Sequence, residues 1–149
     1  MHLFTYGTLM FPEVWRIVVG KDFETRPATL PGYEIRRVKD AVYPGVISLA
    51  AHSQPSTLDS RPSSVPGHLY LNLDPESLAR LDRFEGEDYR RLEVEVTTND
   101  GQSLDAEAYV IRTEHRHLLT DEIWTAQQFA ERGDLARFVA RYGGFQRLE

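Results

Sequence analysis

The sequence feature that most constrains the fold is a predicted helix at residues 74–86. It has clear start and stop residues and lies between two segments with the pattern of strands. Asp74 is a favourable N-cap residue and Pro75 suits the first helical position, while a glycine closes the segment. Residues 67–73 and 90–98 on either side alternate between apolar and more polar side chains, as half-buried strands do. The sequence therefore predicts strand, helix and strand in succession, and the two strands cannot be one continuous element.

Further strands and helices are predicted along the rest of the chain. Strand patterns occupy residues 2–6, 28–30, 33–38, 45–50 and 104–111, and the last of these follows the hairpin signal Asn99-Asp100-Gly101. Helical patterns occupy residues 12–20, 126–132 and 135–142, the last capped by Asp134. The strands cluster between a few helices without regular βαβ alternation. This order predicts an α+β domain with a largely antiparallel sheet, of which a closed barrel is one form.

Composition excludes several classes of protein. At 149 residues the chain has the size of one domain, and we expect residues 1–149 to form it. A net charge of -6 without a clustered basic face argues against nucleic-acid binding. The chain has no cysteine, which excludes disulfides, thiol nucleophiles and cysteine-based zinc sites. No long apolar run or leader pattern is present, so we expect a soluble, cytoplasmic protein.

Residues 52–66 form a polar stretch rich in serine and proline, with no period. Such composition predicts a surface loop. A spacer without function is favoured over a lid that covers a site.

One carboxylate breaks the pattern of the 74–85 helix. Glu85 lies seven residues after Leu78 and four after Leu81, and so shares their apolar face. A buried carboxylate has a raised pKa, which suits a group that exchanges protons near neutral pH. The alternative is that Glu85 turns to water at the helix end or pairs with Arg90 or Arg91, one of which could also steady a buried carboxylate. Strand parity favours Arg90 as the inward-facing arginine.

The second candidate element is the turn Tyr6-Gly7-Thr8-Leu9, directly after the first strand. Its glycine permits close backbone approach, and successive backbone N–H groups can hold a carboxylate or an oxyanion. A plain turn is the alternative. Neither a P-loop nor a dinucleotide-binding glycine pattern occurs in the sequence.

Four motifs in order carry a resemblance to a known family: the early Tyr6–Leu9 turn, the L-D-R-F-E-G helix end, Tyr89-Arg90-Arg91, and Tyr142-Gly143-Gly144-Phe145. Together they resemble the gamma-glutamylcyclotransferase-like family, which includes the gamma-glutamylamine cyclotransferases and the plant avirulence-induced-gene proteins. The resemblance spans nearly the whole chain. It implies a small mixed, largely antiparallel β-barrel with flanking helices.

The resemblance also implies a chemistry and a set of site residues. The family's catalytic glutamate falls on Glu85, as general base and acid, and its substrate-binding loop falls on Tyr6, Gly7, Thr8 and Leu9. Tyr89 matches a further element and is expected to line the pocket or to pack the strand start. The implied reaction releases 5-oxoproline and an amine from a small-molecule gamma-glutamyl substrate, with no metal or organic cofactor.

Several segments of the sequence argue against particular functions, and two alternatives to the implied function remain. After Leu9, Met10-Phe11-Pro12 offers no polar side chain for a leaving-group contact. His115-Arg116-His117 lacks an evident third metal ligand nearby and favours a solvated loop. The aromatic residues of the last helices favour a core role over a stacking platform. A hydrolytic or other acyl-transfer enzyme using Glu85, and a noncatalytic module that binds a small ligand, remain as alternatives.

Overall fold

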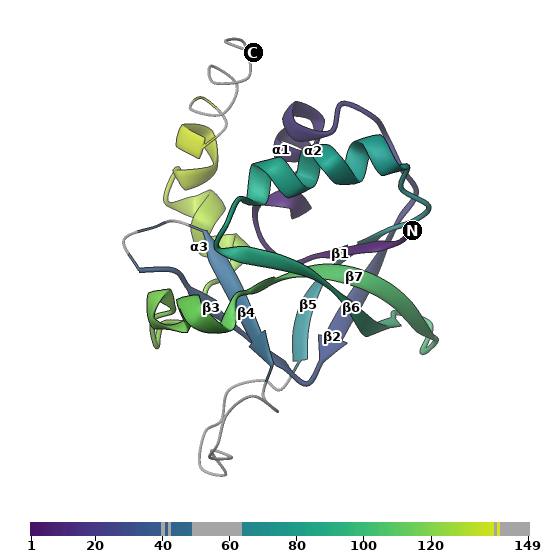
Figure 1. The fold of residues 1–149 in the computed structure, drawn as a ribbon. Coiled ribbons are helices and arrows are strands. Elements are labelled where there is room, and N and C mark those ends of the chain that lie inside the picture. Colours follow the sequence, from purple (N-terminus) through teal and green to yellow (C-terminus); the bar gives the residue numbers. More distant parts are fainter. Residues whose placement is uncertain (40, 42, 49–63, 139, 141–149) are drawn as a thin grey trace.

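Five strands close a barrel in this computed structural model, which describes residues 1–39, 41, 43–48, 64–138 and 140 (Figure 1). The order around the barrel is β1-β5-β2-β6-β7. The strands are β1 (Leu3–Thr5), β2 (Thr25–Pro31), β5 (Ser64–Tyr70), β6 (Tyr89–Thr98) and β7 (Ser103–Ile111). Neighbours are antiparallel except β1 and β7, which pair in parallel and close the ring. The expected mixed, largely antiparallel barrel with flanking helices is confirmed.

The remaining elements surround the barrel. Strands β3 (Tyr33–Arg37) and β4 (Pro44–Ser48) pair as a separate antiparallel sheet. The α-helices are α1 (Pro12–Val18), α2 (Pro75–Glu85) and α3 (Ala126–Glu131), and residues 134–138 and 140 are also helical. The short 3-10 helices include η1 (Thr8–Met10) and η3 (Thr113–Leu118). No helix in the described ranges is long and apolar enough to cross a membrane.

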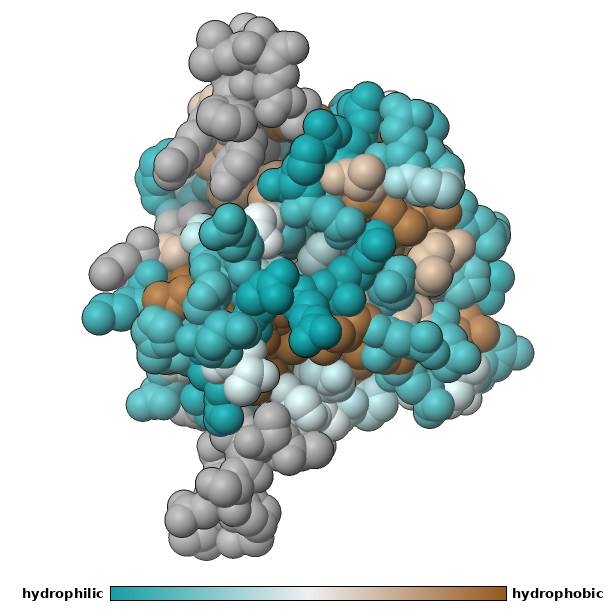
Figure 2. All heavy atoms as spheres, in the orientation of Figure 1, coloured by the Kyte–Doolittle hydropathy of each residue, from teal (hydrophilic) through white to brown (hydrophobic). Residues whose placement is uncertain are grey.

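Apolar side chains form two cores, one inside the barrel and one against part of its outer wall. Side chains inside the barrel form one core, with Phe4, Leu69 and Val96 among its members. The outer core lies under α1 and α2, where the rings of Trp15 and Tyr70 stack with centroids 3.6 Å apart. The two helices lie side by side over one end of the barrel (Figure 1). Polar side chains cover most of the outer surface seen from this side, with apolar atoms between them in limited areas (Figure 2).

Helix α2 begins and ends where its sequence predicts. The Asp74 carboxylate accepts hydrogen bonds from the backbone N–H of Ser77 at 3.4 Å and from its hydroxyl at 2.6 Å. Leu78 and Leu81 are buried against the barrel, and Gly86 ends the helix with φ of 78°. This positive φ strains any residue with a Cβ atom, so the glycine fixes the point at which the chain leaves the helix.

The prediction for residues 64–73 was partly wrong. Residues 64–66 belong to β5 rather than to a loop, and the strand ends at Tyr70 instead of at residue 73. The segment is also not half-buried, because Leu69 and Tyr70 pack into opposite cores. Asn72 adopts a positive φ of 58°, which turns the chain, and Leu73 packs in the outer core instead of following Leu69 into the barrel.

Other predicted strands and helices are confirmed with shifts of a few residues at their ends. β2 is longer than predicted, because residues 25–27 and Pro31 also pair with β5. Several predictions lie outside the described residues: most of the 52–66 loop, the end of the 45–50 strand, the end of the 135–142 helix and the motif at residues 142–145.

Candidate active site

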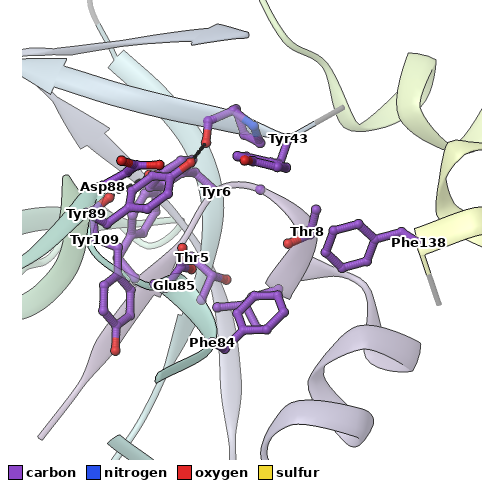
Figure 3. A pocket seen from close by; sticks show the side chains of 14 residues that line it. Thr5, Tyr6, Thr8, Tyr43, Phe84, Glu85, Asp88, Tyr89, Tyr109 and Phe138 are labelled. Atoms are coloured by element: carbon purple, nitrogen blue, oxygen red, sulfur yellow. Dashed lines mark hydrogen bonds between the residues drawn. The ribbon is translucent and has the colours of Figure 1, made fainter. Parts of the chain in front are cut away.

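A cavity of about 90 Å³ lies between the 6–9 turn, the end of α2 and the start of β6 (Figure 3). All six residues that the sequence singled out as site residues line it: Tyr6, Gly7, Thr8, Leu9, Glu85 and Tyr89. They come from segments about 80 residues apart in the chain. The fold therefore joins the two elements that the sequence could only propose separately.

The barrel positions these elements through its closure. Strand β1 runs between β5 and β7 and delivers Tyr6 and Gly7 to the rim of the barrel. Helix α2 ends at Glu85 beside the same rim, and after a turn of three residues Tyr89 opens β6. Tyr89 and Ile111 are the last pair of the β6–β7 ladder, so Tyr89 is held by the sheet.

The carboxyl group of Glu85 is desolvated, although the residue as a whole is only partly buried at the helix end. Burial raises the pKa of Glu85 to about 8, and the negative charge of Asp82 adds to the rise. A carboxyl group with such a pKa changes protonation state close to neutral pH. In Figure 3 its side chain lies toward the cavity, near Thr5.

The expectation that Arg90 turns inward, so that one arginine could steady Glu85, was wrong. Arg90 lies at the rim of the barrel, where other residues no longer cover this side of β6. Its side chain is therefore exposed. Arg91 instead lies 3.6 Å from Oδ1 of Asp82 and 3.6 Å from Oε1 of Glu107. Among the described residues, no basic side chain forms an ion pair with Glu85, and the cavity lining contains no lysine or arginine.

Two tyrosines that line the cavity with Glu85 are anchored by their hydroxyls. Tyr6 donates to the carbonyl of Tyr109 at 2.5 Å, and Tyr89 donates to the carbonyl of Pro44 at 2.6 Å. Burial raises the pKa of both phenols well above the ordinary value. They therefore stay neutral, and their rings form fixed walls of the cavity.

Gly7 is required by the close approach of Pro44. A Cβ atom at position 7 would lie 2.9 Å from Cγ of Pro44. In the turn that follows, the N–H groups of Met10 and Phe11 donate to the carbonyls of Gly7 and Thr8. The N–H groups of Thr8 and Leu9 come before these donors and have no acceptor within the turn. Both residues line the cavity, so an anionic or carbonyl oxygen bound there is a candidate acceptor for these groups.

Sequence reasoning missed several side chains that complete the cavity. These are Phe4, Thr5, Tyr43, Pro44, Phe84, Asp88, Tyr109 and Phe138. Phe138 was expected to be core; it is buried, and it also lines the cavity. Phe84 could have been found from its position next to Glu85. Tyr43 and Tyr109 carry no local signal, because Tyr43 reaches the cavity from just before β4, in the separate sheet, and Tyr109 from β7 of the barrel.

The histidines at 115 and 117 lie in η3, which has no buried residue. Nδ1 of His115 is 3.0 Å from Oδ1 of Asp88, at the edge of the cavity. In the described part of the chain, no three His, Asp or Glu side chains gather in a way that could hold a metal ion.

Comparison with known proteins gives the family. The model of the family described as "Gamma-glutamyl cyclotransferase, AIG2-like" matches residues 3–126. The chain belongs to this family. Protein AIG2 C of Arabidopsis thaliana is 29% identical over 110 residues, which cover 73% of this chain and 60% of that protein. AIG2-like protein D of the same plant is 30% identical over 113 residues, which cover 74% of this chain and 67% of that protein.

Solved structures agree with this membership at the level of the fold. A solution structure of an Arabidopsis thaliana protein superposes with a TM-score of 0.67 at 23% identity, over 97% of this chain and 80% of that one. A yeast gamma-glutamyl cyclotransferase specific to glutathione has a TM-score of 0.62 at 14% identity, over 82% of this chain and 73% of that one. The gamma-glutamyl cyclotransferase fold is thus shared, while the aligned part covers only about three-fifths of AIG2 C.

Proposed function

We propose that this protein is a gamma-glutamyl cyclotransferase that uses Glu85 to release 5-oxoproline and an amine from a gamma-glutamyl compound. The observation that carries the proposal is the desolvated carboxyl group of Glu85, with a pKa of about 8, in a cavity shared with the 6–9 turn. Membership of the family supports the same reaction.

The reaction begins with removal of a proton from the substrate. The α-ammonium group of the gamma-glutamyl moiety cannot attack until it is neutral, and the carboxylate of Glu85 takes the proton. The empty cavity disfavours the ionised form of Glu85. The positive charge of the substrate's ammonium group favours that form when the substrate binds. In this role Glu85 is the general base.

Ring closure then forms one C–N bond and breaks another. The neutral amine attacks the γ-carbonyl carbon, and the oxygen of the tetrahedral intermediate accepts hydrogen bonds from N–H groups of the 6–9 turn. The protonated Glu85 donates to the departing nitrogen as the second C–N bond breaks. The attacking nitrogen loses two protons overall, and both end on the released amine, which leaves as an ammonium ion.

The cavity walls favour cyclisation over hydrolysis. Tyr6, Tyr89 and Phe84 enclose the carboxyl group and limit the space for an attacking water molecule. The substrate supplies its own nucleophile, so the protein needs only to hold it in a bent conformation.

A substrate panel with product analysis tests this proposal. Purified protein is incubated with gamma-glutamyl amino acids and gamma-glutamyl amines, and the products are measured by mass spectrometry. We expect 5-oxoproline and free amine in equal amounts. Free glutamate in place of 5-oxoproline would indicate a hydrolase, and saturable binding without turnover would indicate a binding module; either result contradicts the proposal.

A further inference from the structure

A cavity of about 150 Å³ lies at the barrel rim, between the start of β6, the end of β7 and the separate β3–β4 sheet. It shares no described lining residue with the cavity at Glu85. Among the described residues, its charged lining consists of Arg90, Arg112, Arg116 and Glu114. Positive charge therefore prevails there, although the chain as a whole carries a net charge of -6. A cavity of this kind attracts anions.

The sheet register places two of these arginines on the same side of the barrel wall. Arg90 pairs with Val110 in the β6–β7 ladder. Just beyond the ladder, the N–H of Arg112 donates to the carbonyl of Asp88 at 2.9 Å, which continues the pairing. Since Arg112 follows Val110 by two residues, Arg90 and Arg112 are diagonal cross-strand neighbours on one face. Their long side chains can therefore contact the same ligand.

Neither guanidinium group has an acidic partner within the described part of the chain. Nε of Arg112 donates to the carbonyl of Glu87 at 2.7 Å, an uncharged acceptor that holds the side chain without neutralising it. Arg90 is exposed and forms no ion pair with a described residue. Glu114 is also exposed, so water screens its charge. The two arginines therefore keep their charge and N–H donors for a bound anion.

The rest of the lining suits an organic group attached to the anion. Tyr33 from β3 is half-buried and contributes an aromatic ring. Ile47, Leu92 and Val110 contribute apolar side chains from three other strands. Burial of a hydrocarbon or aromatic group against such side chains is favourable.

We propose that this arginine cavity, defined by Arg90 and Arg112, binds the phosphate group of a small organic phosphate ester. A phosphate monoester carries about -1.5 to -2 charges at pH 7, which matches two guanidinium groups. A carboxylate carries one charge, and a single arginine satisfies it with a bidentate pair. The planar fork of the guanidinium group also fits the arrangement of phosphate oxygens. No step of the proposed reaction depends on this site.

Calorimetric titration of the wild-type protein tests the inference. Phenyl phosphate, inorganic phosphate and benzoate are compared at one ionic strength. We expect saturable binding of phenyl phosphate, at least about fivefold tighter than binding of either other ligand, because only phenyl phosphate combines the phosphate group with a ring. If benzoate or inorganic phosphate binds as tightly as phenyl phosphate, or if phenyl phosphate shows no saturable binding, the inference is overturned.

A matched pair of variants tests the role of the arginines. Arg90→Gln removes one positive charge from the lining, whereas Arg80→Gln removes one from an exposed residue of α2 outside both cavities. We expect Arg90→Gln to weaken the binding of phenyl phosphate by about tenfold and Arg80→Gln to change it by less than about twofold. Equal affinities of the two variants would show that the binding does not depend on the arginine cavity.

Backbone amide chemical shifts locate the bound phenyl phosphate and separate this site from the cavity at Glu85. We expect the largest shift changes at the start of β6 and at residues 112–114, with small changes in the 6–9 turn. If the largest changes fall in the 6–9 turn, the ligand lies in the first cavity and the inference is wrong. Binding is measured without turnover, so failure of the proposed reaction leaves this result unchanged.

Discussion

The hydroxyl of Tyr109 donates a hydrogen bond of 2.6 Å to Oδ1 of Asp82, one helical turn before Glu85. Nη1 of Arg91 lies 3.6 Å from the same oxygen. These contacts tie the last turn of α2 to strands β6 and β7. They hold Asp82 where its charge opposes ionisation of Glu85.

Removing the charge of Asp82 is expected to change the pH dependence of the reaction. In Asp82→Asn the side-chain oxygen can still accept from Tyr109, but the negative charge that raises the pKa of Glu85 is gone. The pKa of Glu85 should fall, so more of the carboxylate base is present at a given pH. The acidic limb of kcat/KM should therefore move to lower pH.

The control for this change is Asp105→Asn, on an exposed residue of β7 outside the cavity lining. The acidic limb of its kcat/KM profile against pH should coincide with that of the wild type. If the acidic limb of the kcat/KM profile of Asp82→Asn stays in place or moves to higher pH, the result contradicts the electrostatic role of Asp82.

Ionisation of Glu85 should destabilise the free protein. Its pKa is about 8 in the folded state and 4.5 is the ordinary value, so the folded state holds the proton more tightly. The free energy of unfolding therefore falls as pH rises between these two values and levels off above the higher one.

Urea unfolding of the wild type and Glu85→Gln across this range measures the effect. We expect equal stabilities near pH 4 and an advantage of about 2–5 kcal/mol for Glu85→Gln near pH 9, where only the wild type buries a charge. A difference between the two proteins that does not vary with pH would show that the carboxyl group is not desolvated.

Much of the fold could be predicted because its signals are local. The Asp74 cap, the glycine at 86 and the hairpin at 99–101 each specify a turn or helix end without help from distant residues. The end of β5 could not be predicted in this way. The leucines at 69, 71 and 73 alternate, but the positive φ of Asn72 breaks the alternation.

The site could be predicted only in part, for a similar reason. Helical phase places Glu85 on the apolar face of α2, and the glycine turn is visible in the sequence. Arg90 was harder, because it shares the parity of the inner-core residues Val94 and Val96, and parity does not show that this side of the strand is open at the rim. The tyrosines at 43 and 109 share the cavity with Glu85 only through the tertiary fold, since one precedes β4 of the separate sheet and the other lies in β7 of the barrel.

Gly7 and Tyr89 should be coupled through Pro44. Gly7→Ala brings a Cβ atom to 2.9 Å from Cγ of Pro44, while Tyr89 holds the carbonyl of Pro44 by a hydrogen bond. We expect Gly7→Ala to lower kcat/KM by about 10- to 100-fold, because the turn must shift.

A double-mutant cycle tests this coupling. Tyr89→Phe keeps the ring but releases Pro44, which can then move away from a Cβ atom at position 7. The same Gly7→Ala change should therefore cost less in the Tyr89→Phe background. Identical losses in the two backgrounds would mean that Pro44 does not connect the residues.

Gly67 should be essential to the barrel. A Cβ atom there would lie 2.1 Å from the carbonyl oxygen of Thr5, in the paired strand β1. We expect Gly67→Ala to lower the free energy of unfolding by more than about 3 kcal/mol, because β1 and β5 must separate.

Gly101→Asn is the comparison for this variant, since asparagine tolerates the positive φ of that hairpin position. It should cost less than about 1 kcal/mol in urea unfolding. Equal losses for the two variants would contradict the close packing assigned to Gly67.

The most direct test of the proposed reaction is the rate of 5-oxoproline release by the wild type, Glu85→Gln and Glu76→Gln with the best substrate of the panel. Glu76 is an exposed residue in the first turn of the same helix, so its variant makes the same chemical change away from the cavity. We predict a loss of about 10²- to 10⁴-fold for Glu85→Gln, with an unchanged circular dichroism spectrum, and wild-type activity for Glu76→Gln. A folded Glu85→Gln protein that releases 5-oxoproline at the wild-type rate would contradict the role of Glu85.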